Sequence, residues 1–287
     1  MQKILGIDIG GSHITLAQVD AEHHKIITST YIREHVDSFE KKENILTSWI
    51  DAIHKVIKDE DLNNLQIGIA MPGPFDYENG ISLMEQGKFI ELFQLNIKSE
   101  LASRLSINAR QIHFINDAAA FLEGEVFGGC VQNYQKIFGI TLGTGLGTTF
   151  YNGIKATDED LWDSPFKSSI AEDYLATRWY VNRYFELTGE KISGTLDLLD
   201  KSKNIQDQVF TEYANSFADF IIQYVHDYSP EVIVVGGNIA KAYTYFEEKL
   251  TKKLSDNGIN LPIIISSIFE DAAILGAASY AIKSVKS

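Results

Sequence analysis

The segment I-D-I-G-G-S-H-I-T-L-A, residues 7–17, joins two short apolar runs through a pair of glycines. Lys3–Ile9, before the glycines, is rich in large aliphatic residues, and Ile14–Val19, after them, alternates apolar with small or polar residues. Two such runs separated by glycines are typical of β-strands joined by a tight turn. We therefore predict a β-hairpin near the start of the chain.

The turn of this hairpin has the features of an anion-binding site. Gly10 and Gly11 let the backbone approach a ligand closely, and the exposed N–H groups of such a turn form a concavity that binds anions. Asp8 lies next to the turn and could hold a hydrated Mg²⁺ that bridges nucleotide phosphates, because hard cations prefer carboxylate oxygen and water. On this segment alone, an ordinary hairpin with a surface aspartate is an equal alternative.

A second glycine-rich turn, T-L-G-T-G-L-G-T-T, occupies residues 141–149. We expect a strand before it, over Lys136–Leu142, and a strand that resumes at Thr149–Tyr151. The spacing of the glycines is not the G-x-G-x-x-G fingerprint, and the turn lacks the Lys-Ser/Thr of a P-loop, so a Rossmann domain is disfavoured. The pattern fits a hairpin that grips phosphates through N–H and hydroxyl donors, or a plain glycine-rich hairpin.

Two more strand ends carry candidate ligand-binding residues. V-I-V-V-G-G-N-I-A, residues 232–240, places two glycines after an aliphatic strand, where adenine or ribose could lie against the backbone, although a packing turn is favoured for this element alone. F-I-N-D-A-A-A-F, residues 114–121, places Asp117 between a buried strand and a helix, where ligands commonly bind in α/β proteins. Asp117 could equally be a helix cap. With Asn116 beside it, a functional pair is attractive, because an amide can orient a hydroxyl while a carboxylate takes its proton.

The remaining pattern predicts an α/β protein in two halves, each of which begins with a strand, a glycine-rich turn and a strand. We expect a boundary near residue 116, which gives segments 1–116 and 117–270, with the terminal helix 271–287 packing on the first half. Further strands are expected at Lys25–Ile32, Leu65–Ala70, Ile112–Ile115, Glu231–Val235 and Pro262–Ser266, and helices at Glu43–Ile57, Ser99–Leu105, Ala118–Val126, Glu172–Glu186, Val209–Tyr228 and Ala272–Ile282.

Composition excludes several classes of protein and site. The 287-residue chain has a formal net charge of −14, which argues against a nucleic-acid partner. Cys130 is the only cysteine, so neither an intrachain disulfide nor a thiolate zinc cluster can form. The first residues lack the features of a signal peptide, and no apolar stretch reaches the roughly 18 residues that span a bilayer. We expect a cytoplasmic protein with no membrane partner.

As an ordered set, the motifs resemble the ROK family of sugar kinases and repressors, within the actin–hexokinase superfamily. The resemblance implies an α/β protein of the actin-like ATPase (ribonuclease H-like) fold, with two lobes and an interlobe cleft. It also implies a homodimer that binds ATP, Mg²⁺ and a small sugar. The resemblance covers nearly the whole chain and rests on Gly6–Ser12, Gly68–Pro74, Asn116–Ala118, Leu142–Gly147 and Val235–Gly237.

The resemblance implies a role for each motif. Asp117 is the general base that deprotonates a hydroxyl of a hexose or hexose derivative, in a glucokinase-like reaction. Asn116, Gly73 and Pro74 lie on the sugar side of the site. The expected ATP- and phosphate-binding residues are Asp8, Gly10, Gly11, Ser12, Thr15, Gly143, Thr144, Gly145, Gly236 and Gly237, with Asp8 also the candidate Mg²⁺ ligand.

The segment between Gly153 and Glu172 departs from the family pattern. The family usually carries E-x-G-H followed by a C-x-C-G-x-x-G-C zinc loop, and this chain has neither the histidine nor the cysteines there. We therefore expect no structural zinc. Glu172 resembles the last glutamate of the family pattern and keeps an expected sugar contact. Glu159, Trp162 or Asp163 could replace the missing contacts.

Two other functions compete with a kinase. A catalytically weak sugar or nucleotide sensor of the same fold is suggested by the altered segment, although the retained Asp117 argues against it. The repressor branch of the family carries a helix-turn-helix domain before the first phosphate turn. Here that turn already lies at Gly10, and the net charge is unfavourable for DNA, so a repressor is not expected.

Overall fold

The computed structural model of the protein describes residues 4–58 and 61–286. The chain forms two compact units: unit 1 comprises Met1–Gln132 with Glu270–Ser287, and unit 2 comprises Asn133–Phe269. Helix α3 (Asp117–Phe127) lies in unit 1, where it packs against α9 (Asp271–Lys286). The units therefore divide after α3, whereas the predicted boundary near residue 116 lies before it.

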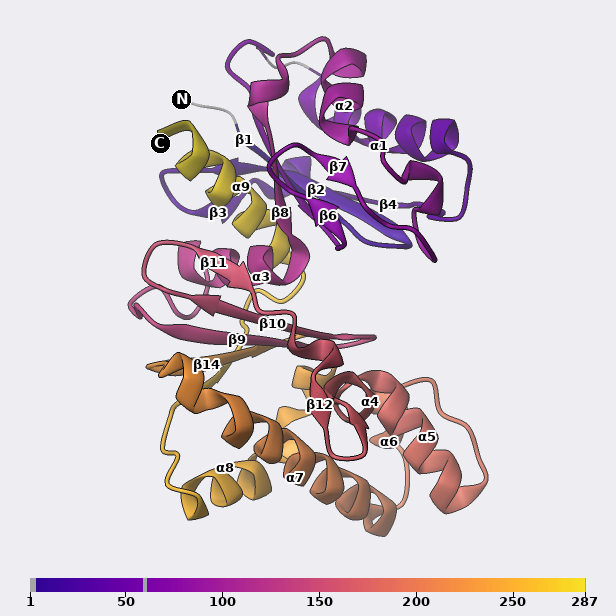
Figure 1. The fold of residues 1–287 in the computed structure, drawn as a ribbon, viewed down its shortest axis with the longest axis vertical. Helices are drawn as coiled ribbons and strands as arrows, with labels where there is room; N and C mark the ends of the chain where they lie inside the picture. The colour runs from indigo at the N-terminus through magenta and orange to yellow at the C-terminus, as the bar shows by residue number, and fades with distance from the viewer. Residues whose placement is uncertain (1–3, 59–60, 287) are drawn as a thin grey trace. The chain divides into compact units, whose positions relative to one another are not determined.

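Unit 1 is built on a six-stranded sheet of mixed direction (Figure 1). Its strand order is β3-β2-β1-β5-β8, and β4 also pairs with β2. The first two strands form the predicted antiparallel hairpin, and the first, fifth and eighth strands run parallel. The strands are β1 (Ile4–Ile9), β2 (His13–Asp20), β3 (Lys25–Ile26), β4 (Ile32–His35), β5 (Gln66–Met71) and β8 (Ile112–Asn116).

The prediction of a single strand at Lys25–Ile32 is wrong. The structure has β3 and β4 there, separated by the 3₁₀ turn η1 (Thr28–Thr30). The Thr30 hydroxyl accepts a hydrogen bond from the N–H of Gln18 at 2.9 Å and donates to the carbonyl of Ile27 at 2.7 Å. A side chain thus replaces a backbone partner of β2, and a local turn interrupts the strand.

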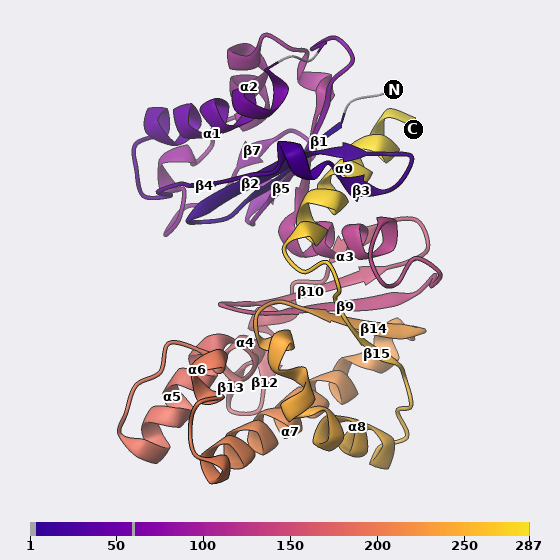
Figure 2. The ribbon, with the colours of Figure 1, turned by 180° about the vertical axis from the view of Figure 1, so that it is seen from behind.

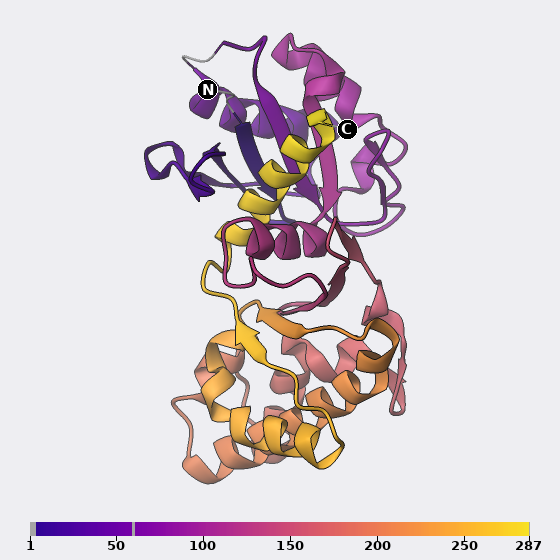
Figure 3. The ribbon, with the colours of Figure 1, turned by 90° about the vertical axis from the view of Figure 1, so that its left-hand side faces the viewer.

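Helices cover both faces of this sheet. On one face, α1 (Lys42–Ile57) and α2 (Ile97–Leu105) share a hydrophobic core with alternate residues of β1 and β5, because successive strand residues point to opposite faces. On the other face, α9 contacts β1, β5 and β8, and Figure 3 shows it running along the sheet beside α3. Short elements complete unit 1: β6 (Phe75–Asp76), β7 (Ile81–Ser82), η2 (Ile90–Leu92) and η3 (Ala109–Gln111).

Unit 2 repeats the plan of a hairpin followed by parallel strands (Figure 2). Its five-stranded sheet has the order β11-β10-β9-β14-β15, in which β9 and β10 are antiparallel, while β14 runs parallel to both β9 and β15. The elements are β9 (Ile137–Leu142), β10 (Leu146–Tyr151), β11 (Ala156–Asp158), η4 (Leu161–Asp163), β12 (Pro165–Phe166), β13 (Ser169–Ile170), α4 (Ala171–Leu175), α5 (Thr177–Thr188), α6 (Thr195–Leu198), α7 (Lys203–Tyr228), β14 (Val232–Gly236), η5 (Ile239–Tyr245), α8 (Glu247–Asp256) and β15 (Ile263–Ile265).

The helix predicted at Glu172–Glu186 is two helices, α4 and α5, which meet at Ala176. Ala176 has extended backbone angles, with φ −89° and ψ 168°. The N–H and the hydroxyl of Thr177 both donate to the carbonyl of Gly143, each at 2.8 Å. Because these donors bind the glycine turn between β9 and β10, the helix breaks at the point where it meets the turn.

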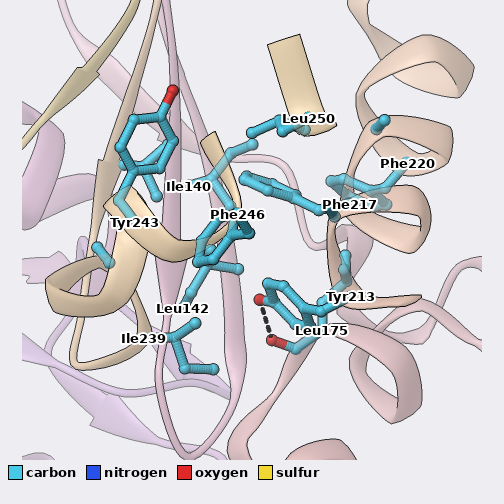
Figure 4. Close-up of a cluster of buried hydrophobic side chains, with 14 of the residues drawn as sticks. Ile140, Leu142, Leu175, Tyr213, Phe217, Phe220, Ile239, Tyr243, Phe246 and Leu250 are labelled. Carbon is cyan, nitrogen blue, oxygen red and sulfur yellow. Dashed lines mark hydrogen bonds between the residues drawn. The ribbon is translucent and has the colours of Figure 1, made fainter. Parts of the chain in front are cut away.

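The core of unit 2 is aromatic and lies between the sheet and the long helix α7. Figure 4 shows Tyr213 and Phe217 of α7 pointing toward Phe246 and Leu142. The Tyr213 hydroxyl donates to the carbonyl of Leu175 at 2.9 Å, so the end of α4 is joined to α7 inside the core. This contact fixes the end of α4, the short helix that directly precedes Ala176.

Candidate active site

In unit 1, one row of side chains crosses three neighbouring strands close to the first glycine turn. Asp8 of β1 lies opposite Thr15 of β2, and Thr15 lies opposite Arg33 of β4. Directly opposed residues of antiparallel strands project on the same face of a sheet. Asp8, Thr15 and Arg33 therefore share one face, and Thr15, in the middle of the row, is buried.

The turn between β1 and β2 offers backbone donors that have no partner within the chain. The N–H of Gly10 donates to the carbonyl of His13 at 2.9 Å, which closes the turn. The N–H groups of Gly11 and Ser12 make no hydrogen bond to the part of the chain that the structure describes. Free N–H groups in such a turn suit an anion.

Asp117 is the first residue of α3 and directly follows β8. One oxygen of its carboxylate accepts the N–H of Ala118 at 2.9 Å. Asp117 is exposed, unlike the residues on either side of it. The carboxylate is therefore held by the backbone at the start of the helix and is open to a substrate.

The helix cap is Asn116, not Asp117. The Asn116 carbonyl oxygen accepts the N–H of Ala119 at 3.0 Å, and its amide nitrogen donates to the Tyr77 hydroxyl at 3.2 Å. Tyr77 in turn donates to the carbonyl of Met71 at 3.1 Å. These contacts fix the direction of the Asn116 amide and leave its second N–H for another acceptor.

The carboxylates of Asp8 and Asp117 both have raised pKa values. The pKa of Asp8 is raised to about 7, chiefly because burial desolvates the carboxylate and also because of the negative charges of Asp117 and Glu270, while the positive charge of Arg33 lowers it. Desolvation also raises the pKa of Asp117, against the N–H groups of Ala118 and Asp117 itself. Solvent reaches the exposed Asp117, which moderates the rise. The charge effect on Asp8 shows that the structure brings these two predicted residues together.

Two cations at this site were missed by the sequence analysis. Arg33 forms an ion pair with Glu270, which lies just before α9. The side chain of Lys88 crosses Gly11, and its positive charge lowers the pKa of Asp117. The sequence around Arg33 does not alternate, because the polar residues Glu34 and His35 follow it. No local pattern marks Lys88, which lies in a loop.

The predicted sugar-side residues Gly73 and Pro74 are joined by a cis peptide bond. The Tyr77 hydroxyl lies 3.4 Å from the point that a Cβ of Gly73 would occupy. The carbonyl of Pro74 accepts the N–H of Leu83 at 3.1 Å. This turn therefore lies beside the Tyr77 hydroxyl that also contacts Asn116.

In unit 2, a glutamate of a different element, α4, binds the backbone at the end of the second glycine turn. The N–H of Gly143 donates to the carbonyl of Gly145 at 3.0 Å within the turn. Glu172 of α4 accepts the N–H of Leu146 at 3.0 Å and forms an ion pair with Arg178 through its other oxygen. Glu172, predicted as a sugar contact, thus has two partners within unit 2. Thr144 lies between the two turn glycines.

The third glycine element follows β14. Gly236 ends the strand, and Gly237 has a positive φ of +84°. A Cβ on Gly237 would lie 2.7 Å from the carbonyl carbon of Leu142 and 2.8 Å from its nitrogen. Only glycine fits there, so this element packs directly against the strand that leads into the second glycine turn.

The sequence model of the ROK family matches residues 4–157 and 170–284 of the chain. The chain belongs to the ROK family. A glucokinase from Thermotoga maritima is 25% identical over 318 aligned positions, which cover 96% of each chain. An N-acetyl-D-glucosamine kinase from Mannheimia succiniciproducens is 22% identical, over 96% of this chain and 98% of the relative.

Solved structures of the ROK family share the fold. A ROK family glucokinase from Streptomyces griseus, in complex with glucose and AMPPNP, matches with a TM-score of 0.77 at 19% identity, over 96% of this chain and 98% of that one. The predicted family and the predicted actin-like α/β fold are confirmed. The predicted enzyme class, a sugar phosphotransferase, is that of the curated ROK relatives.

The ROK match omits residues 158–169, inside the segment where the sequence departs from the family pattern. Glu159 accepts the hydroxyl of Thr157 at 2.6 Å. The Trp162 indole N–H donates to Asp160 at 2.6 Å, and the Trp162 side chain is 42% exposed. Glu159 is thus engaged within its own hairpin, and Trp162 presents an aromatic surface to solvent.

The described residues contain no group of three or more His, Cys, Asp or Glu side chains arranged to hold a metal ion. Among the helices of the same residues, none is long and apolar enough to cross a membrane.

Proposed function

We propose that this ROK protein transfers the γ-phosphoryl group of ATP to a hydroxyl of a hexose or hexose derivative, with Asp117 as the general base. The observation that carries the proposal is the position of Asp117, exposed at the end of β8 and within the field of Asp8. In α/β proteins, ligands bind at the carboxyl ends of parallel strands. The curated relatives named above are a glucokinase and an N-acetyl-D-glucosamine kinase, which supports a hexose as the acceptor.

Asp117 activates the acceptor by removing its proton. A neutral hydroxyl is a poor nucleophile, and a positioned base contributes roughly 10²–10⁴-fold to such a reaction. The raised pKa of Asp117 suits this task, because a base works best when its pKa approaches the working pH. The N–H of Ala118 keeps one carboxylate oxygen fixed and leaves the other for the hydroxyl.

The sugar is oriented by groups beside the base. The Asn116 amide, held by Ala119 and Tyr77, has one free N–H for a sugar hydroxyl. The turn at Gly73 and Pro74 lies next to the same tyrosine and closes this side of the site. Fixed donors of this kind reduce the entropy that the acceptor loses on reaching the transition state.

Phosphate binding in unit 1 is assigned to the first glycine turn and Asp8. The free N–H groups of Gly11 and Ser12 donate hydrogen bonds to phosphate oxygens, and Thr15 lies opposite Asp8 on the next strand. The donor set at Asp8 fits a hydrated Mg²⁺, because one carboxylate suffices for an ion that keeps its water and binds nucleotide phosphates. When bound, such an ion neutralises charge on the phosphates.

Nucleotide binding in unit 2 is assigned to its two glycine elements. The turn at Gly143, Thr144 and Gly145 offers N–H and hydroxyl donors for phosphate. Gly236 and Gly237, at the end of β14, are assigned to the adenosine side of the nucleotide. Because the reaction consumes ATP, we place the protein in the cytoplasm, and we expect a homodimer, which sedimentation velocity would test.

The test is a coupled assay of ADP release with purified protein over a panel of hexoses, N-acetylhexosamines and their epimers. We expect sugar-dependent ADP release with at least one hexose, and none without sugar. The altered segment 158–169 motivates the alternative of a weak sensor. Sugar binding by calorimetry without ADP release from any sugar would favour that sensor and reject the kinase.

A further inference from the structure

Lys88, which no motif includes, crosses the first glycine turn. It lies between β7 and η2, in the loop Q-G-K-F at residues 86–89. The point that a Cβ on Gly11 would occupy is 2.6 Å from Cε of Lys88 and 2.8 Å from its Nζ. The end of the lysine side chain therefore lies directly against the backbone of Gly11.

The backbone that carries Lys88 is anchored at Phe89. Phe89 is fully buried and packs edge-to-face on Trp49, with ring centroids 5.5 Å apart. Its N–H donates to the carbonyl of Ser38 at 2.8 Å. Phe89 has a left-handed φ of +59°, which is uncommon for a bulky residue and persists only where the surroundings enforce it. The base of the Lys88 side chain is thus fixed, while the side chain itself is exposed.

The ammonium of Lys88 is available to an anion. It forms no ion pair or hydrogen bond with the residues that the structure describes, whereas Arg33 nearby pairs with Glu270. It lies over the turn whose Gly11 and Ser12 N–H groups have no partner in the described chain. Its charge also lowers the pKa of Asp117, so it lies within the field of the base.

We propose that Lys88 binds the phosphoryl group while it moves from ATP to the sugar. The proposal rests on the kinase function proposed above. In the transfer, the bond from the γ-phosphorus to the ADP oxygen breaks, the bond to the sugar oxygen forms, and the hydroxyl proton passes to Asp117. Lys88 transfers no proton and forms no covalent bond. Its ammonium stabilises the negative charge on the phosphoryl oxygens, together with the N–H groups of Gly11 and Ser12.

The test compares Lys88→Met and Lys88→Arg with the wild type, and uses Lys55→Met as a matched control. Lys55 lies on α1 and pairs with Glu34, so its loss removes the same charge away from the turn. We expect Lys88→Met to lower kcat by about 100-fold or more, with the sugar KM within about threefold of wild type. Lys88→Arg should retain an intermediate kcat, and Lys55→Met should match the wild type.

A pH profile provides a readout that a merely structural role would not move. Asp117 faces the charges of Asp8 and Lys88, and Asp8 in turn faces those of Arg33 and Glu270. Removing Lys88 takes away a charge that lowers the pKa of Asp117, so the acid limb of kcat/KM should move to higher pH in Lys88→Met. A kcat within about threefold of wild type together with an unmoved acid limb would overturn the proposal.

A binding measurement separates this proposal from the kinase function. Inorganic tripolyphosphate should raise the melting temperature of the wild type and of Lys55→Met, and Lys88→Met should lose most of that shift. If the wild type releases no ADP with any sugar, the kinase proposal fails. The melting-temperature measurement still shows whether Lys88 binds an anion. An undiminished shift in Lys88→Met, or no shift in the wild type, would overturn the anion-binding role.

Discussion

The carboxylate of Glu172 accepts a hydrogen bond from the backbone N–H of Leu146, with the two atoms 3.0 Å apart. Through its other oxygen, Glu172 forms an ion pair with Arg178. The first turn of α4 is thereby tied to the glycine turn between β9 and β10. A hydrogen bond to a charged group contributes more to stability than one between neutral groups.

We predict that Glu172→Gln weakens this connection and loosens the glycine turn. The substitution removes the charge that strengthens the bond to Leu146 and the ion pair with Arg178, which should lower the free energy of unfolding by about 2 kcal/mol. The KM for ATP should rise. Urea denaturation and steady-state kinetics measure the two effects.

Asp173→Asn is the matched control for this prediction. Asp173 is also within ion-pair distance of Arg178, at 3.6 Å, but makes no hydrogen bond to the glycine turn. Its loss should cost less than about 0.5 kcal/mol. A larger KM for sugar with an unchanged KM for ATP in Glu172→Gln would instead support the sugar contact expected from the family resemblance.

A second prediction compares the hydroxyl groups of two buried tyrosines of unit 2. The Tyr213 hydroxyl donates to the carbonyl of Leu175, while the Tyr180 hydroxyl is buried without a partner among the described residues (Figure 4 draws the first contact). Tyr213→Phe should destabilise the protein by about 1.5 kcal/mol, because it leaves a buried carbonyl unsatisfied. Tyr180→Phe should be neutral or slightly stabilising, because it removes a hydroxyl that no group satisfies.

Denaturant midpoints at equal protein concentration measure both substitutions. Equal losses of stability in Tyr213→Phe and Tyr180→Phe would show that the difference in hydrogen bonding does not matter. The two residues are both fully buried and their rings are 4.6 Å apart, so the comparison holds burial nearly constant.

The fold and much of the site follow from local sequence patterns. The hairpin around Gly10, the turn around Gly145 and the strand that leads into Asp117 all consist of an aliphatic run that ends in glycine or a polar residue. Such runs identify strands and their ends without any knowledge of packing. Strand ends are also where ligands bind, so the same pattern indicates the candidate residues.

The remaining features depend on contacts between distant residues. Lys88 acquires its place from Phe89, which is buried against Trp49, and no spacing within the loop marks it. The break at Ala176 arises because Thr177 binds the carbonyl of Gly143, a residue far earlier in the chain. Helical periodicity continues across that point, so the pattern alone predicts one helix.

A third prediction concerns the pH dependence of activity. Both Asp8 and Asp117 must be ionised, the first to hold a cation and the second to accept a proton. Burial raises the pKa of both carboxylates, and the charge of Asp117 adds to the rise at Asp8, whose pKa is about 7. Protonation should therefore inactivate the enzyme at a higher pH than for ordinary aspartates. Consequently kcat/KM should rise with pH up to about 7 or above. The apparent pKa values of this rise belong to Asp8 and Asp117 as a pair.

Asp8→Asn separates the two carboxylates. It removes a negative charge near Asp117, so the weaker remaining activity should show an acid limb at lower pH than that of the wild type. A wild-type acid limb near pH 4, the value of an unperturbed aspartate, would be inconsistent with the raised pKa values. Profiles of kcat/KM from pH 4.5 to 9 provide the measurement.

The general base is tested most directly by Asp117→Asn. Asparagine keeps the size of the side chain and cannot take a proton, so kcat should fall by about 10³-fold or more while nucleotide binding persists. The measurement is ADP release with the best sugar of the panel, made beside calorimetric titration with a non-hydrolysable ATP analogue. Loss of turnover with retained nucleotide affinity is the predicted result, and sugar-dependent ADP release within about tenfold of wild type would contradict the assignment of Asp117 as the base.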